Sequence, residues 1–269
     1  MKILHNLLGI LCGFALMIIL LITSIEAVTY WTPGYYEKEY AKYGVLQDVH
    51  MEMNDLLDVT DQMMAYLRGN REDLHVPTVV DGQPREFFND REIAHMEDVR
   101  GLFLGGLALR RISIGLIVVC VVLLFARKAD VRRVLPKMIC AGSALFFAVL
   151  AILAAIISTD FNKYFIIFHH IFFNNDLWLL NPDLLINIVP EPFFMDTAAR
   201  IAVTYGVSVL AVFAICLIIL YYNDRRGKKR KSDAGLPVNW FSIACPKIIR
   251  ISPDKENPSL PGFLGDKTE

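Results

Sequence analysis

Four long apolar segments constrain this 269-residue chain more than any other feature of its sequence. They cover residues 7–25, 112–126, 138–158 and 201–222. A helix needs about 20 apolar residues to cross a hydrocarbon core about 30 Å thick, and three of the segments have about that length. The second segment covers only about 22 Å as a helix. It therefore needs the long side chains of Arg110 and Arg111 to lie at a membrane interface.

The composition agrees with a chain that spans a membrane. Hydrophobic residues make up 55% of the chain, charged residues only 20%, and the mean hydropathy is +0.43. Soluble domains hold about 45–50% apolar residues. These values exclude a disordered chain, a small disulfide-stapled domain and a typical soluble enzyme. We therefore predict an all-α membrane protein with four transmembrane helices.

Charge alternates between the segments that connect the four spans. Short basic blocks, residues 127–133 and 225–231, follow the second and fourth spans. By contrast, residues 26–100 hold sixteen Asp or Glu against seven Lys or Arg, and residues 159–199 hold five against one. Because positive loops stay inside, we predict that both termini lie in the cytoplasm and that the two acidic loops face outward.

This topology predicts the domain organisation. Residues 1–225 form the four-span membrane domain with outer loops 26–100 and 159–199, and residues 226–269 form a basic, then polar, cytoplasmic tail. The first span is predicted to be an uncleaved helix, since its apolar run is longer than that of a typical signal peptide. All five cysteines lie in the spans or the tail, so the outer loops contain no residue that could form a disulfide.

The first outer loop contains two predicted local structures. Residues 54–67 carry apolar side chains at helical spacing, which predicts an amphipathic helix that ends at Gly69. Farther along, residues 76–80 and 84–88 flank Asp81-Gly82, a pair that fits a type I′ turn. They could form a small β-hairpin, so we expect amphipathic helices, a re-entrant helix and this hairpin to cap the outer face.

His95 lies in a charged helix, predicted over residues 89–100, that leads to the second span. If this helix continued straight to Arg127, His95 would lie about 48 Å from the inner interface, well above the thickness of a membrane core. We expect a bend at Gly105-Gly106 that lays the His95 helix along the outer surface. A solvated surface histidine would give the same pattern, so the sequence leaves both readings open.

Residues 164–173 of the second outer loop form an apolar run that is too short to span a membrane. This run, followed by polar residues and Trp178, is typical of a re-entrant or interfacial segment. It would place His169 and His170 at membrane depth, where ionisable side chains are often functional, although an interfacial hydrogen bond would also satisfy them. Neighbouring helical residues point about 100° apart, so only one of the two is expected to face a site.

Several chemistries can be excluded from the sequence. The outer loops contain no cysteine and no His-x-x-x-His, and Glu92-x-x-His95 has no second copy, which argues against a metal site. No serine-nucleophile motif and no Gly-rich phosphate loop occurs, which argues against covalent serine or nucleotide chemistry. The basic run 225–231 directly follows a span, so it indicates membrane orientation and not a nucleic-acid partner. We expect no cofactor.

Two groups of residues form a recognisable combination. Before the second span the chain contains Glu92-x-x-His95-x-x-Asp98-Val99. Before the fourth span it contains Phe168-His169-x-x-Phe172-Phe173, then Trp178, Pro182, Leu185-Ile186 and Pro190-Glu191-x-Phe193-Phe194. Together with Asn54-Asp55-Leu56 and Tyr66-Leu67-x-Gly69 in the first loop, these motifs resemble the bacterial lipoprotein intramolecular transacylase family over residues 1–225.

The resemblance implies a specific reaction. A member of this family moves the sn-2 acyl chain of a diacylglyceryl-modified N-terminal cysteine to the α-amino group of that cysteine, which gives a lyso-form lipoprotein. The implied partners are the diacylated lipoprotein N-terminus and membrane lipids. The implied location is the bacterial cell membrane, with the active site at the outer leaflet.

The resemblance also implies the roles of individual residues. His95 and His169 occupy the positions of the two functional histidines of the family, whereas His170 does not match. An amine that attacks an ester needs a base near neutral pKa, and the leaving glycerol oxygen needs an acid, so two histidines are sufficient. Asp98 could orient or stabilise the His95 ring, and Glu92 and Trp178 are expected to support the site.

Two other functions remain open at this stage. A membrane lipid hydrolase could use the same histidines. A non-catalytic assembly or transport accessory could use them to sense pH. The distance between His95 and His169 in a structure is the most useful observation here, because the catalytic reading requires that both histidines open into one lipid-facing pocket.

Overall fold

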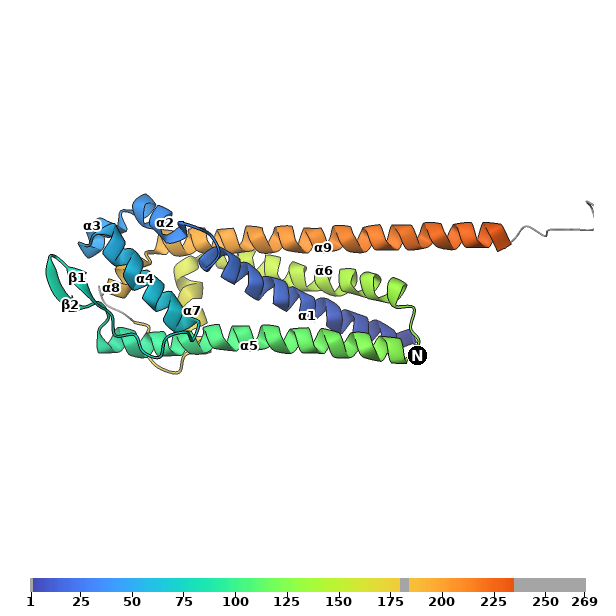
Figure 1. The fold of residues 1–269 in the computed structure, drawn as a ribbon, viewed down its shortest axis with the longest axis horizontal. Coiled ribbons are helices and arrows are strands. Elements are labelled where there is room, and N and C mark those ends of the chain that lie inside the picture. The colour runs from blue at the N-terminus through green and yellow to red at the C-terminus, as the bar shows by residue number, and fades with distance from the viewer. Residues whose placement is uncertain (1, 180–183, 235–269) are drawn as a thin grey trace, which may run out of the picture. The chain divides into compact units, whose positions relative to one another are not determined.

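Four of the helices are long and apolar enough to cross a membrane, as predicted. The computed structural model describes residues 2–179 and 184–234, so Pro182 and Cys245 lie outside the described residues. The described elements are, in order, α1 (Lys2–Thr29), α2 (Tyr35–Tyr43), α3 (Val45–Val49), α4 (Met53–Leu67), β1 (Pro77–Val80), β2 (Gln83–Glu86), α5 (Asp90–Ala126), α6 (Val131–Ile157), α7 (Phe161–Phe172), α8 (Leu184–Ile188) and α9 (Glu191–Ala234) (Figure 1). The spans are α1, α5, α6 and α9.

The chain divides into two compact units at Arg225. The first unit, residues 1–225, contains the four spans and every other described element. The second unit begins at Arg226, and its described part is the end of α9.

Helix α1 is the common packing partner of the other three spans. Its contact with α6 depends on glycine, because a methyl group on Gly9 would come within 2.6 Å of the Met138 Cβ atom. A methyl group on Gly142 of α6 would likewise come within 3.0 Å of a backbone oxygen of α1. Small residues at such crossings let two membrane helices approach closely, and this contact is the main attraction between helices in lipid.

The remaining faces of α1 are used by α5 and α9. Cys12 is buried together with Cys120 of α5, and Met17 is buried together with Tyr205 of α9. Of the four spans, α1 is therefore the most enclosed by protein.

The bend expected at Gly105-Gly106 is wrong, because α5 is one uninterrupted helix of 37 residues (Figure 1). Glycine lowers helix propensity by about 1 kcal/mol, but tertiary packing routinely outweighs this. Here Gly106 faces α1, where a methyl group would meet the Ile22 side chain at 3.5 Å. A helix of this length extends about 55 Å, so the end that carries His95 projects beyond a 30 Å core.

A cap covers the projecting end of α5. It consists of α2, α3, α4, the β1–β2 hairpin and α8, and we call these elements the cap throughout. Its core is a single cluster of buried side chains, the most enclosed of which are Tyr40, Val45, Val49, Leu56, Val59, Leu74, Val76, Phe87 and Ile188. The described cysteines are all unpaired, so packing and polar contacts hold the cap together.

The predicted amphipathic helix and hairpin of the first loop are both present. Helix α4 ends at Leu67 and is followed by Gly69 with φ of +81°. Strands β1 and β2 pair antiparallel, with Val80 opposite Gln83. Asp81 and Gly82 between them both have positive φ, 52° and 68°, as a type I′ turn requires.

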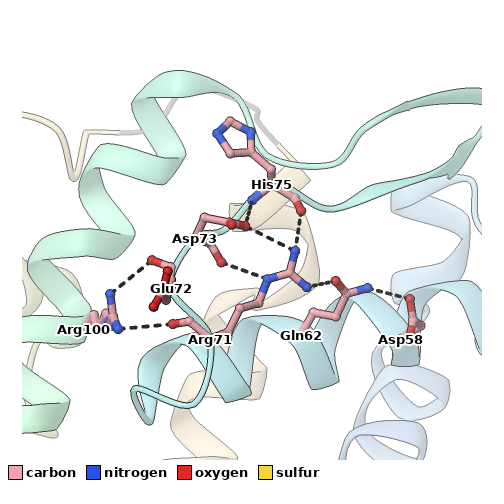
Figure 2. Close-up of polar contacts among 7 residues, drawn as sticks. All are labelled: Asp58, Gln62, Arg71, Glu72, Asp73, His75 and Arg100. Atoms are coloured by element: carbon pink, nitrogen blue, oxygen red, sulfur yellow. Dashed lines mark hydrogen bonds and ion pairs between the residues drawn. The ribbon is translucent and has the colours of Figure 1, made fainter.

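A polar network fastens the segment between α4 and β1 to α5 (Figure 2). Arg71 donates from Nη2 to the backbone oxygen of His75 at 2.6 Å and from Nε to that of Asp73 at 2.9 Å. Arg100 of α5 donates to the backbone oxygens of Arg71 and Glu72 at 3.1 and 3.4 Å. The cap is thus attached directly to the helix that carries His95.

A buried carboxylate links α1, α4 and α5. Glu26, whose side chain is only 5% exposed, forms ion pairs with Arg110 of α5 and with Arg68 at the end of α4, the latter at 3.0 Å. Arg110 was expected only to reach a membrane interface, and nothing in the sequence analysis predicted this pair. The contact lets the charge of Arg110 lie beside the apolar part of α5, because the opposite charge of Glu26 compensates it.

Candidate active site

The structure brings His95 of α5 and His169 of α7 together. Their ring centroids lie 6.1 Å apart, and the ring planes are inclined by 33°. His95 is 8% exposed and His169 is 7% exposed. The reading of His95 as a solvated surface histidine is therefore wrong.

The local structure of α7 orients His169. Asp160 caps the start of this helix by accepting a hydrogen bond from the Lys163 N–H at 3.0 Å. In the last turn, Nδ1 of His169 lies 2.7 Å from the backbone oxygen of Phe165. Because a carbonyl oxygen can only accept, Nδ1 carries the proton, and Nε2 of the neutral ring has the free lone pair.

The surroundings of His169 favour this neutral form. Burial lowers the pKa of His169, the bond to Phe165 offsets part of this effect, and the nearby His170 lowers it further. An ordinary histidine has a pKa of about 6.5, so His169 is predominantly neutral at pH 7. It is therefore available there to accept a proton at Nε2.

Aromatic rings enclose the histidine pair. The ring of Phe173 lies 5.5 Å from that of His95 and 5.4 Å from that of His169. Trp178 lies 4.8 Å from His169, and Phe165 lies 4.1 Å from it. Trp178, expected to support the site, is thus in direct contact with one of the two histidines.

His170 does not belong to the pair. Its side chain is exposed, and its ring meets the edge of Trp178 at 5.3 Å. This agrees with the expectation that only one of the two adjacent histidines faces the site.

Glu92 joins α8 of the cap to the start of α5. Its side chain is 1% exposed, and one carboxylate oxygen accepts from the Asn89 N–H at 2.8 Å, which completes the capping box at the start of α5. The other oxygen accepts from the Leu185 N–H at 2.7 Å. Glu92 therefore attaches α8 to the helix that carries His95.

Burial lowers the pKa of His95, the nearby His169 lowers it further, and the charge of Asp98 offsets part of this effect. Asp98 thus acts on the His95 ring through its charge, as the sequence suggested it could, but its hydrogen bond goes to another residue. Its Oδ2 accepts a hydrogen bond from Asn175 Nδ2 at 2.8 Å. Nδ1 of His95 is buried and has no hydrogen-bond partner within the described part of the chain. Spacing along a helix places Asp98 near His95, but the distant Asn175 is the partner that its carboxylate contacts.

The described residues offer no converging metal site. Among them, no group of three or more His, Cys, Asp or Glu side chains is arranged to hold an ion. The two carboxylates nearest the site hold other segments in place, Glu92 binding α8 and Asp98 binding Asn175, as described above.

Comparison with known families decides the identity of the fold and its class of reaction. A family model described as "Lipoprotein intramolecular transacylase Lit" matches residues 10–194, which is more than half of the chain and includes both histidines. This protein belongs to the Lit family. As a Lit family member it is a multi-pass membrane protein and an acyltransferase that acts on lipoproteins.

Solved structures support this assignment at the level of the fold. The membrane integral lipoprotein intramolecular transacylase Lit from Bacillus cereus matches with a TM-score of 0.67 and 21% identity, over 85% of this chain and 100% of that one. A variant of that protein with a histidine replaced by arginine matches with a TM-score of 0.66 and 20% identity, over 85% and 94% of the two chains. None of the curated proteins that were compared matches this Lit family member.

Proposed function

We propose that this Lit family protein moves the sn-2 acyl chain of a diacylglyceryl-modified N-terminal cysteine to the α-amino group of that cysteine. His95 and His169 are the catalytic residues of this proposal. The observation that carries it is the placement of two buried histidine rings 6.1 Å apart in an aromatic enclosure, in a chain of this family.

The proposed reaction balances without a cofactor. The α-amine forms a bond to the ester carbonyl carbon while Nε2 of His169 takes a proton from the nitrogen. The resulting tetrahedral intermediate collapses when the bond from carbon to the glycerol oxygen breaks. That oxygen receives the proton that His169 took from the nitrogen, passed on through His95, so both histidines end the reaction neutral. One ester is lost, one amide is formed, and no atom enters or leaves.

In this proposal, the enzyme accelerates the reaction by holding the reacting groups together and by enclosing them. Holding the amine beside the carbonyl is worth about 7 kcal/mol or more for well-oriented groups. The rings of Phe165, Phe173 and Trp178 around the histidines disfavour water as a competing nucleophile. The same enclosure argues against a lipid hydrolase, since that enzyme must admit water to the same carbon.

The product provides the direct test. The protein is coexpressed with a model lipoprotein, and the N-terminal lipopeptide is measured intact and after fragmentation by mass spectrometry. We expect an unchanged intact mass, an amide-linked acyl chain on the cysteine and a single remaining glyceryl ester, because transfer within one molecule is an isomerisation. Loss of one acyl mass would instead identify a hydrolase. A fragmentation pattern equal to that of cells without the protein would exclude both enzymes.

We also propose that both termini are cytoplasmic and that the histidine pair lies at the outer leaflet. The support is the alternation of basic and acidic connecting segments. Cys245 is a natural reporter, because the tail would lie inside. In intact spheroplasts, an impermeant thiol reagent should leave Cys245 unlabelled until the membrane is opened. Labelling before permeabilisation would move both histidines to the cytoplasmic face and contradict the proposal.

A further inference from the structure

Three side chains of α5 share one face around His95. Arg91, His95 and Asp98 follow one another at spacings of four and three residues, which places them in a row along a helix. Both neighbours of His95 bind the same short turn, residues 174–176 between α7 and α8. Asp98 accepts from Asn175 Nδ2 at 2.8 Å, and Arg91 donates from Nη2 to the backbone oxygen of Asp176.

Both the oxygen and the nitrogen of the Asn175 side-chain amide form hydrogen bonds. Its Oδ1 accepts from the Leu177 N–H at 3.0 Å, which folds the turn on itself. Its Nδ2 donates to Asp98, which fastens the turn to α5. An aspartate at position 175 could keep the first bond but not the second, because a carboxylate has no proton to donate.

The fastened turn lies between the residues that enclose the histidines. Phe173, immediately before it, touches both histidine rings. Trp178, shortly after it, touches His169. The position of the turn on α5 therefore determines how these two rings, and the end of α7 that carries His169, lie against His95.

We infer that the hydrogen bond between Asn175 and Asp98 is a positioning contact that sets the geometry of the histidine pair. Asp98 contributes to activity by accepting this bond, in addition to the electrostatic effect of its charge on His95. Asn175 is the positioning residue, with Arg91 as the second point of attachment. This inference rests on the proposed function for its catalytic consequence, but the geometry of the contact does not depend on the reaction.

Single and reciprocal substitutions separate the two roles of Asp98. Asn175→Asp keeps the turn, removes the donor and places two carboxylates together, so we expect kcat to fall about tenfold or more with little change in KM. Asp98→Ala removes the acceptor and should give a similar fall, whereas Asp98→Asn keeps an amide oxygen that can still accept from Asn175 and should fall much less. The double variant Asp98→Asn, Asn175→Asp exchanges donor and acceptor, rebuilds the bond and should recover most of the activity.

The outcome that overturns the inference is specific. If Asp98 contributes only through its charge on His95, Asn175→Asp will stay near normal, and Asp98→Asn and the double variant will both be as slow as Asp98→Ala. Asn174→Asp is the matched control, since it adds the same charge one residue away on an exposed side chain. It should behave like the wild type.

Tryptophan fluorescence tests the contact between Asn175 and Asp98 independently of activity. With Trp31 and Trp240 replaced by phenylalanine, the fluorescence of the protein comes from Trp178, which is buried against His169. Asn175→Asp should shift this emission to longer wavelength, and the double variant should reverse the shift. Absence of the shift would overturn the inference. If the wild type made no transacylated product, the proposed function would fail, while this emission would still decide whether the contact positions the turn.

Discussion

Replacing either His95 or His169 with alanine is expected to lower the rate of acyl transfer at least about 100-fold. Each substitution removes one of two groups that exchange protons with the reacting atoms, and general acid–base catalysis is typically worth about 10²- to 10⁴-fold. The rate is measured as formation of the amide-linked lipopeptide by purified protein in detergent. Membrane insertion and accumulation should be unchanged, because the cap is held mainly by other residues.

His170→Ala is the matched control for both histidine substitutions. It removes the same type of side chain from the adjacent position on α7, where the ring is exposed and lies beside the edge of Trp178. Its effect should be much milder. Near-normal turnover in either His95→Ala or His169→Ala would refute the catalytic pair, and an equal loss at His170 would mean that the wrong neighbour had been assigned.

Glu26→Ala is expected to cost about 3 kcal/mol or more in stability. The substitution removes the carboxylate that two arginines share and leaves Arg110 and Arg68 without their compensating charge in a partly buried place. Breaking a buried pair by removing one partner is far more damaging than losing a surface pair. Thermal unfolding of the protein in detergent measures the effect, as a melting temperature lower by several degrees.

Glu37→Ala is the control for Glu26→Ala. Glu37 is an exposed acid in the first turn of α2, so its loss should change the melting temperature little. If Glu26→Ala and Glu37→Ala both had the wild-type melting temperature, the ion pairs between Glu26 and the two arginines would not contribute to stability.

Local features of the chain were predictable from the sequence because their causes are local. Apolar length gave the four spans, and Asp81-Gly82 gave the hairpin, since the turn depends on two residues that adopt positive φ. The bend at Gly105-Gly106 failed for the opposite reason. Glycine there indicates a weak point only in an isolated helix, and α1 packs against Gly106 in the folded protein.

The candidate site was predictable only in part. His95 and His169 were paired by resemblance to a family. Hydrophobic periodicity describes one helix at a time, so it cannot show that residues on two different helices lie together. The partner of Asp98 was missed, since Asn175 lies 77 residues away and its amide is one of many polar groups in the loop. Glu26 was missed for the same reason, as Arg110 lies 84 residues along the chain. Such contacts exist only after the helices have assembled.

The central position of α1 has a consequence for biosynthesis. Chains are made from the N-terminus, so α1 leaves the ribosome and enters the membrane before α5, α6 and α9. The surfaces that later contact α5, α6 and α9 are then already in place when each of those helices is inserted. Assembly can proceed span by span in the order of translation, with no late helix needed to complete a partner for an early one. A peptidase that removed α1 as a leader would take away the template on which the rest of the bundle is built.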